Sequence, residues 1–211
     1  MDGGLRLHER LALEVLDSHG ALASIGPCVA IFGGARVKDD SPFYAAARQT
    51  ARLLSQSGVS VITGGGPGIM AAANEGAKLG GKGKSIGLLI TLPFEEKANS
   101  HLDVRLTFNH FASRKVAFCR HAKAFVFFPG GYGTMDELGD VLALMVTGKT
   151  EPAPIIMYDS AHWSWLIVWM KERMLGQGLI SPDHLDCLLF ADRAEDIPPV
   201  IERWYEKGLA A

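Results

Sequence analysis

The feature that most constrains the fold is a stretch in which a short apolar segment runs into closely spaced glycines and then into a helical pattern. Residues 125–128 are apolar with strand character, and the glycines that follow are Gly130, Gly131 and Gly133. Thr134 and Glu137 then have the spacing of a capping box, which predicts that Thr134 is the N-cap of a helix. The stretch therefore predicts a strand, a glycine turn and a helix.

A turn of this kind suits a phosphate group. Unpaired backbone N–H groups and the positive end of the helix dipole gather where a helix begins. Glycines let that backbone approach an anion closely, because they carry no Cβ. An ordinary tight turn before a capped helix is the competing interpretation of this single motif.

The rest of the chain alternates short apolar segments with helical patterns. We expect strands at residues 28–32, 59–63, 84–90, 104–108, 125–128, 154–158 and 188–190. We expect helices at residues 5–18, 43–56, 69–79, 113–121, 136–147, 163–175 and 195–207. In the helix at 163–175, the side chains expected in the core are Trp165, Leu166, Trp169 and Met170.

This alternation predicts an α/β protein with a Rossmann-like, doubly wound parallel sheet that is flanked by helices on both faces. Neither a linker nor an internal repeat interrupts the pattern. We therefore expect residues 1–211 to form a single Rossmann-like nucleotide-binding domain, with residues 1–20 as an N-terminal helical extension.

Three of the expected strands end in glycine-rich turns, at residues 33–34, 64–68 and 130–133. Right-handed crossovers bring such turns to the carboxyl edge of the sheet, and ligands bind there where the strand order reverses. We expect Gly33 and Gly34 to lie beside Gly130 and Gly131, with residues 64–68 next to them. Three glycine turns at one edge favour a nucleotide-like ligand.

Composition excludes several classes of function. The net charge is −2 and the chain has no basic tract, so we expect no binding to nucleic acid. The three cysteines are scattered and the histidines lack metal-ligand spacing, so neither a disulfide framework nor a metal site is expected. No apolar run has the length of a membrane span, and the N-terminus lacks the pattern of a signal peptide. These features predict a cytoplasmic protein that does not bind membranes.

The motifs together resemble the LOG (Lonely Guy) family of cytokinin riboside 5′-monophosphate phosphoribohydrolases, long described as lysine decarboxylases. Residues 129–137 match the pattern P-G-G-x-G-T-x-x-E, and residues 113–115 resemble the family's Arg-Lys pair. Residues 63–70 resemble its second glycine motif, and residues 93–95 its P-x-E element. The N-terminal helix and the turn at 32–36 resemble the longer bacterial branch, although many members carry serine where this chain has Gly34-Ala35.

The resemblance implies hydrolysis of the N-glycosidic bond of a purine nucleoside 5′-monophosphate, such as AMP or a cytokinin riboside monophosphate, to a free base and ribose 5-phosphate. It implies no cofactor, and a homodimer or larger homo-oligomer. By resemblance, Arg114 and Glu137 are catalytic. Substrate binding is assigned to Glu95, Lys115, Gly34, Gly65, Gly66, Gly130, Gly131, Gly133 and Thr134.

Several alternatives stay open at this stage. Asp136 competes with Glu137 as the working carboxylate, since the phase of the helix is uncertain by a residue. Glu137 can also be explained as the capping partner of Thr134, and Arg114 as a surface charge in a weak ion pair. Because molybdenum cofactor carrier proteins use a similar fold, a nucleotide- or cofactor-binding protein without turnover is the alternative function. Which base is released is also left open.

Overall fold

The computed structural model describes residues 5–93 and 98–206, and its centre is one sheet of seven parallel strands. The strand order is β4-β3-β2-β1-β5-β6-β7. The strands are β1 (Cys28–Phe32), β2 (Ser60–Thr63), β3 (Ser85–Ile90), β4 (Val104–Phe108), β5 (Ala122–Phe127), β6 (Ile155–Tyr158) and β7 (Leu188–Ala191). The strand order reverses between β1 and β5, so the predicted doubly wound sheet is confirmed.

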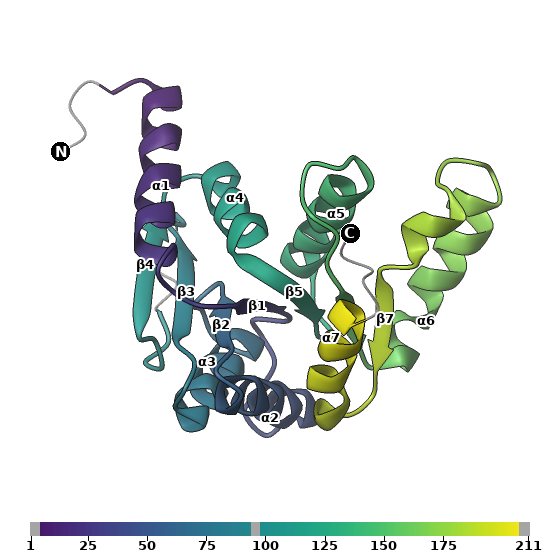
Figure 1. The fold of residues 1–211 in the computed structure, drawn as a ribbon, viewed down its shortest axis with the longest axis horizontal. Coiled ribbons are helices and arrows are strands. Elements are labelled where there is room, and N and C mark those ends of the chain that lie inside the picture. The colour runs from purple at the N-terminus through teal and green to yellow at the C-terminus, as the bar shows by residue number, and fades with distance from the viewer. Residues whose placement is uncertain (1–4, 94–97, 207–211) are drawn as a thin grey trace.

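Helices cover both faces of this sheet (Figure 1). One face carries α1 (Leu7–Leu22), α4 (Phe111–His121), α5 (Tyr132–Val146) and α6 (Ser160–Trp169), which a π-helix, η1 (Met170–Leu175), continues. The other face carries α2 (Pro42–Gln56), α3 (Ile69–Gly80) and α7 (Ile197–Glu206). Two short 3₁₀ helices, η2 (Pro182–Leu185) and η3 (Ala194–Asp196), flank β7.

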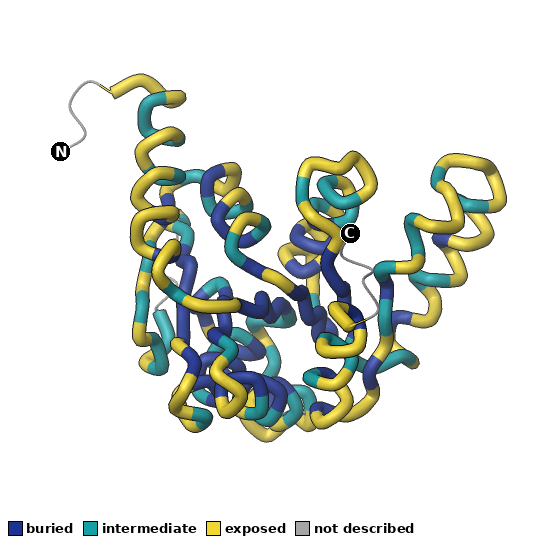
Figure 2. The backbone as a smooth tube through the Cα atoms, in the orientation of Figure 1, coloured by how far each residue is buried: buried dark blue, intermediate teal, exposed yellow. Residues whose placement is uncertain are grey.

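The central strand β1 is apolar throughout because both of its faces are buried. Along β1, Cys28, Ala30 and Phe32 enter the core under α4 and α5. Val29 and Ile31 enter the opposite core, under α2 and α3. Figure 2 shows the central strands buried, whereas much of α1 and α6 is exposed. Among the described helices, none is both long and apolar enough to cross a membrane.

The start of α5 differs from the prediction. The helix begins at Tyr132, and Gly131 is its N-cap without a side-chain hydrogen bond. The predicted capping box of Thr134 and Glu137 is therefore wrong. Gly131 serves as N-cap without a capping side chain, so the helix starts three residues earlier than the Thr134 signal indicates.

The helix predicted at 163–175 is also corrected in part. Trp163 and Met170 are buried, but 81% of Trp165 and 52% of Trp169 remain exposed, so the prediction that these two belong to the core is wrong. At the edge of the sheet only one side of α6 has a layer to pack against. Trp163 occupies that side, and its Nε1 donates a hydrogen bond to the Tyr158 carbonyl at 3.0 Å.

Candidate functional site

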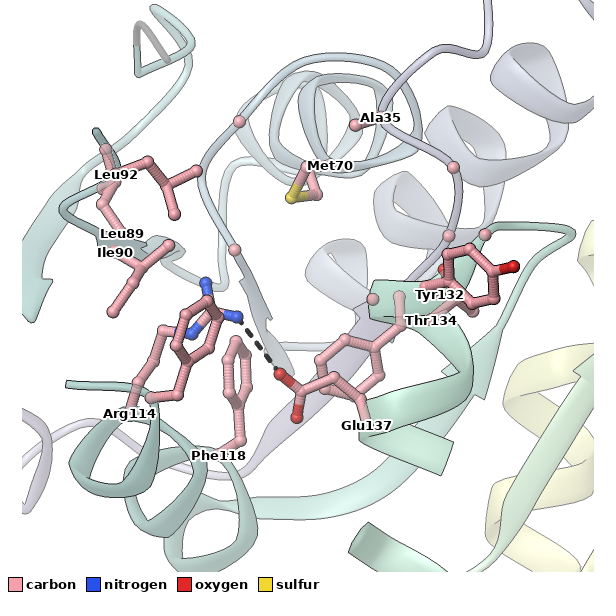
Figure 3. A pocket seen from close by; sticks show the side chains of 18 of the residues that line it. Ala35, Met70, Leu89, Ile90, Leu92, Arg114, Phe118, Tyr132, Thr134 and Glu137 are labelled. Carbon is pink, nitrogen blue, oxygen red and sulfur yellow. Dashed lines mark hydrogen bonds and ion pairs between the residues drawn. The ribbon is translucent and has the colours of Figure 1, made fainter. Parts of the chain in front are cut away.

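The predicted meeting of the glycine turns is confirmed at the carboxyl edge of β1 and β5. The Gly34 N–H donates to the Pro129 carbonyl at 3.0 Å, which ties the first turn to the third. The Ile69 N–H donates to the Gly34 carbonyl at 3.1 Å, which ties in the second turn. A cavity of about 560 Å³ opens where the three turns meet, a size that accepts a nucleotide-sized ligand (Figure 3).

The first turn of α5 forms one wall of this cavity, through Gly131, Tyr132, Gly133 and Thr134. The first intrahelical hydrogen bond runs from the Met135 N–H to the Gly131 carbonyl, at 3.1 Å. The earlier N–H groups of the helix have no partner within it and are free for a ligand. A Cβ built on Gly131 or Gly133 would meet no atom within 4 Å, so the space above both glycines is open.

A second helix start, that of α3, borders the same cavity. Its N-cap is Gly68, with φ of 65°, and Met70 in its first turn lines the wall. A Cβ on Gly68 would lie 2.3 Å from the Gly34 carbonyl oxygen, so only glycine allows the two turns to approach this closely. Two helix N-termini thus contribute positive potential to one cavity, which favours an anionic ligand.

Arg114 of α4 and Glu137 of α5 face each other inside the cavity (Figure 3). The Arg114 Nη2 lies 3.2 Å from Glu137 Oε1, and the two side chains are only 14% and 5% exposed. The guanidinium also lies 5.3 Å from the centre of the Phe111 ring and 5.7 Å from that of Phe118. The ion pair is therefore largely buried and has aromatic neighbours, so the interpretation of Arg114 as a surface charge is wrong.

The electrostatics of Glu137 suit acid–base chemistry. Burial raises the pKa of its carboxyl group, and the positive charges of Arg114 and Lys115 oppose that rise only in part. Asp136 and Asp140 on the same helix raise the pKa further. A carboxyl group whose pKa is moved toward neutrality exchanges protons more readily at working pH than an exposed one does.

Asp136 points away from this site. Its side chain is 52% exposed, and it accepts a hydrogen bond from Lys115 Nζ at 2.9 Å. Lys115 Nζ also lies 3.3 Å from Asp140 Oδ1, which links α4 to α5 outside the cavity. Neither Asp136 nor Lys115 is among the residues that line the cavity. Of the two competing carboxylates, only Glu137 faces the space where a ligand fits.

The structure brings together most of the residues predicted for the site. Those that line the cavity are Gly34, Gly66, Arg114, Gly131, Gly133, Thr134 and Glu137. Gly65 and Gly130 lie behind the wall and shape it: a Cβ on Gly130 would lie 2.1 Å from Thr134 Oγ1. Lys115 lies outside, as described above. Glu95 lies outside the described residues.

Sequence reasoning missed the apolar side of the cavity, which is formed by Leu89 and Ile90 at the end of β3, by Leu92 just after it and by Phe111 at the start of α4. The position of the first three at the carboxyl end of a strand was the available signal. Arg36 in the first turn also lines the cavity. Among the described residues, no group of His, Cys, Asp and Glu side chains is arranged to hold a metal ion.

Comparison with known proteins points to one family. Residues 70–201 match the family model described as "Possible lysine decarboxylase". The cytokinin riboside 5′-monophosphate phosphoribohydrolase LOG2 of Arabidopsis thaliana is 25% identical, over 85% of this chain and 84% of the relative. A cytokinin riboside 5′-monophosphate phosphoribohydrolase of Mycobacterium tuberculosis is 29% identical, over 71% of this chain and 80% of the relative. The molybdenum cofactor binding protein of Rippkaea orientalis shares the fold, with a TM-score of 0.60 and 21% identity over 84% of this chain and 96% of its own.

Proposed function

We propose a function for this chain from the fact that it belongs to the LOG family, whose model carries the description "Possible lysine decarboxylase" and whose named relatives are nucleotide phosphoribohydrolases. The chain hydrolyses the N-glycosidic bond of purine nucleoside 5′-monophosphates of the AMP or cytokinin riboside type, and releases a free base and ribose 5-phosphate. The observation that carries this proposal is the buried Arg114–Glu137 pair beside two helix N-termini in one cavity.

The cavity provides a separate place for each part of such a substrate. The 5′-phosphate lies on the free N–H groups at the start of α5, where Gly131 and Gly133 leave space. Glu137 lies about 7.5 Å further along the helix axis than Tyr132, at a rise of about 1.5 Å per residue, which is on the scale of a ribose. The apolar wall of Leu89, Ile90 and Leu92 is then available to the base.

The proposed reaction is the addition of one water molecule. As the bond from C1′ to the base nitrogen breaks, C1′ gains positive charge, and the Glu137 carboxylate stabilises that charge. The water oxygen bonds to C1′ while Glu137 accepts one of the water's protons. That proton then passes to the departing base nitrogen, so Glu137 returns to its charged form. Arg114 orients the carboxylate through the 3.2 Å contact and keeps a larger fraction of it charged.

The test is the release of ribose 5-phosphate from a panel of purine and pyrimidine 5′-monophosphates, with adenosine as the matched substrate that lacks a phosphate. We expect AMP to be a far better substrate than adenosine, since adenosine makes no contact at the start of α5. Equal kcat/KM for the two would refute the phosphate site. Binding of nucleotides without release of ribose 5-phosphate from any of them would instead support a carrier without turnover.

A further inference from the structure

One side chain of the N-terminal helix α1, Glu14, contacts the start of α4. Glu14 Oε1 accepts hydrogen bonds from the Asn109 N–H at 2.9 Å and from Asn109 Nδ2 at 3.1 Å. Its Oε2 accepts a hydrogen bond from the hydroxyl of Ser113. His110 Nδ1 lies 3.2 Å from Oε1, so one carboxylate contacts three residues around the start of α4.

This contact is well defined and largely buried. The Glu14 side chain is 13% exposed and that of His110 is 24% exposed. Burial alone would raise the pKa of Glu14, but the hydrogen bonds from Ser113 and Asn109 outweigh it and hold the pKa below its ordinary value. The carboxylate is therefore charged at neutral pH. A negative charge beside the N-terminus of α4 is favourable, because it faces the positive end of the helix dipole.

The first turn of α4 has no cap of its own. Its N-cap residue, His110, makes no side-chain capping bond. Glu14 instead holds this turn from another helix, through the Asn109 N–H just before it and the Ser113 hydroxyl within it. The segment that Glu14 holds, from Asn109 to Ser113, contains Phe111 and is followed directly by Arg114. Phe111 stacks on the Arg114 guanidinium, and both line the cavity. A shift of this turn would therefore change the distance from Arg114 to Glu137.

The packing of α1 does not depend on Glu14 alone. At the other end of the contact between the two helices, the His19 and His121 rings lie 5.5 Å apart. Leu22 is only 1% exposed in the core. These contacts keep α1 on α4 when Glu14 is changed, so the effect of Glu14 on the site is separable from loss of the helix.

We propose that Glu14 is a positioning residue for the site: it fixes the first turn of α4 so that Phe111 and Arg114 meet Glu137. The N-terminal helix is thereby a working part of the cavity and not only an extension of the fold. The expected effect of Glu14 on catalysis rests on the proposed function. Its expected effect on the position of Arg114 rests on geometry alone.

The test compares Glu14→Ala and Glu14→Gln with Asp17→Asn, which removes the same charge from an exposed position on the same helix. Since the phosphate site lies on α5, Glu14→Ala should lower kcat for AMP about tenfold to a hundredfold and change KM much less. Glu14→Gln keeps an acceptor for the Asn109 N–H and should recover part of the loss. Asp17→Asn should resemble the parent.

A measurement without turnover keeps the two proposals distinct. The pKa of Glu137 is followed by NMR titration of its labelled side-chain carboxyl carbon. The charged and titratable groups around it are Arg114, Lys115 and Cys119 on α4, Asp136 and Asp140 on its own helix, and Arg36 across the cavity. Among these groups, Arg114 is the one that Glu14→Ala should displace. With Arg114 further away, the pKa of Glu137 should rise further. The acid limb of the pH profile of kcat/KM should then move to higher pH.

The outcomes separate cleanly. If Glu137 titrates in Glu14→Ala as it does in the parent, the positioning role is refuted, whatever the activity. A fall in kcat that only follows a lower melting temperature, with Glu137 unchanged, likewise shows a structural role alone. If Glu137 shifts as expected but the parent hydrolyses no nucleotide, the positioning role stands and the proposed function fails.

Discussion

Gly131→Val tests the phosphate site with little risk to the fold. Gly131 is the N-cap of α5, with φ of −99° and ψ of −152°, an extended conformation with negative φ that does not require glycine. A Cβ at this position would meet no atom within 4 Å. The branched side chain therefore extends into the space in front of the free N–H groups and occupies it without displacing protein atoms.

The expected size of the effect follows from the hydrogen bonds that would be lost. A phosphate forced away from the turn loses one or two charge-assisted hydrogen bonds, each worth roughly 1.5–3 kcal/mol. A loss of about 1.5–6 kcal/mol weakens binding by roughly tenfold to 10⁴-fold. The stability of the fold should change by about 1 kcal/mol or less, because replacing a glycine lowers the entropy of the unfolded chain by a similar amount.

The assay is calorimetric titration of AMP into the parent and the variant, together with their melting temperatures. Gly139→Val is the matched control: a Cβ at Gly139 also meets no atom within 4 Å, and the residue lies further along α5, outside the cavity. Gly139→Val should bind AMP like the parent. An AMP affinity of Gly131→Val within about threefold of the parent, with an unchanged melting temperature, would refute the placement of phosphate on this turn.

Four further changes test other parts of the structure. Gly130→Ala should lower the melting temperature, because its Cβ would lie 2.1 Å from Thr134 Oγ1. Glu137→Gln should lower kcat by roughly 10²–10⁴, whereas Asp136→Asn should retain most of it. Burial raises the pKa of Glu137 in the folded protein, so ionising this carboxyl group lowers the unfolding free energy as pH rises from acid toward neutrality. Glutamine does not ionise. The unfolding free energy of Glu137→Gln should therefore fall less than the parent's between acid and neutral pH. The exposed apolar side chains on α6 suggest a self-association face, so Trp169→Glu should reduce the mass measured by light scattering from that of a dimer or larger assembly to that of a monomer.

The fold was predictable because its determinants are local and repeated. Short apolar segments identify buried strands, and the handedness of the crossovers then leaves few topologies. The adjacency of Gly34 and Pro129 followed from that topology and not from either motif alone. Predictions of which side chains lie inside were weaker at the edge of the sheet. Trp165 and Trp169 share apolar character with Trp163, but only Trp163 faces another layer.

The composition of the site was predictable in part. Arg114 and Glu137 were found through motifs, yet their contact depends on two helices that the sequence does not place relative to each other. The apolar wall from Leu89 to Leu92 has no motif, because any hydrophobic residue in the right place forms such a wall. The contacts of Glu14 were out of reach, since a carboxylate on an amphipathic helix looks the same whether it faces solvent or another helix.

The mistaken capping box and the catalytic proposal both depend on the residue at which α5 begins. Had α5 begun after Thr134, Glu137 would lie in the first turn and its carboxylate would be engaged by the Thr134 N–H. Because α5 begins at Tyr132, Glu137 lies in the second turn, turned inward and only 4% exposed. Burying the Glu137 carboxylate in this position is unfavourable, and its ion pair with Arg114 compensates for the burial only in part. A capping role does not explain such burial, whereas a water-excluded setting strengthens the effect of a carboxylate on positive charge that develops at a sugar carbon.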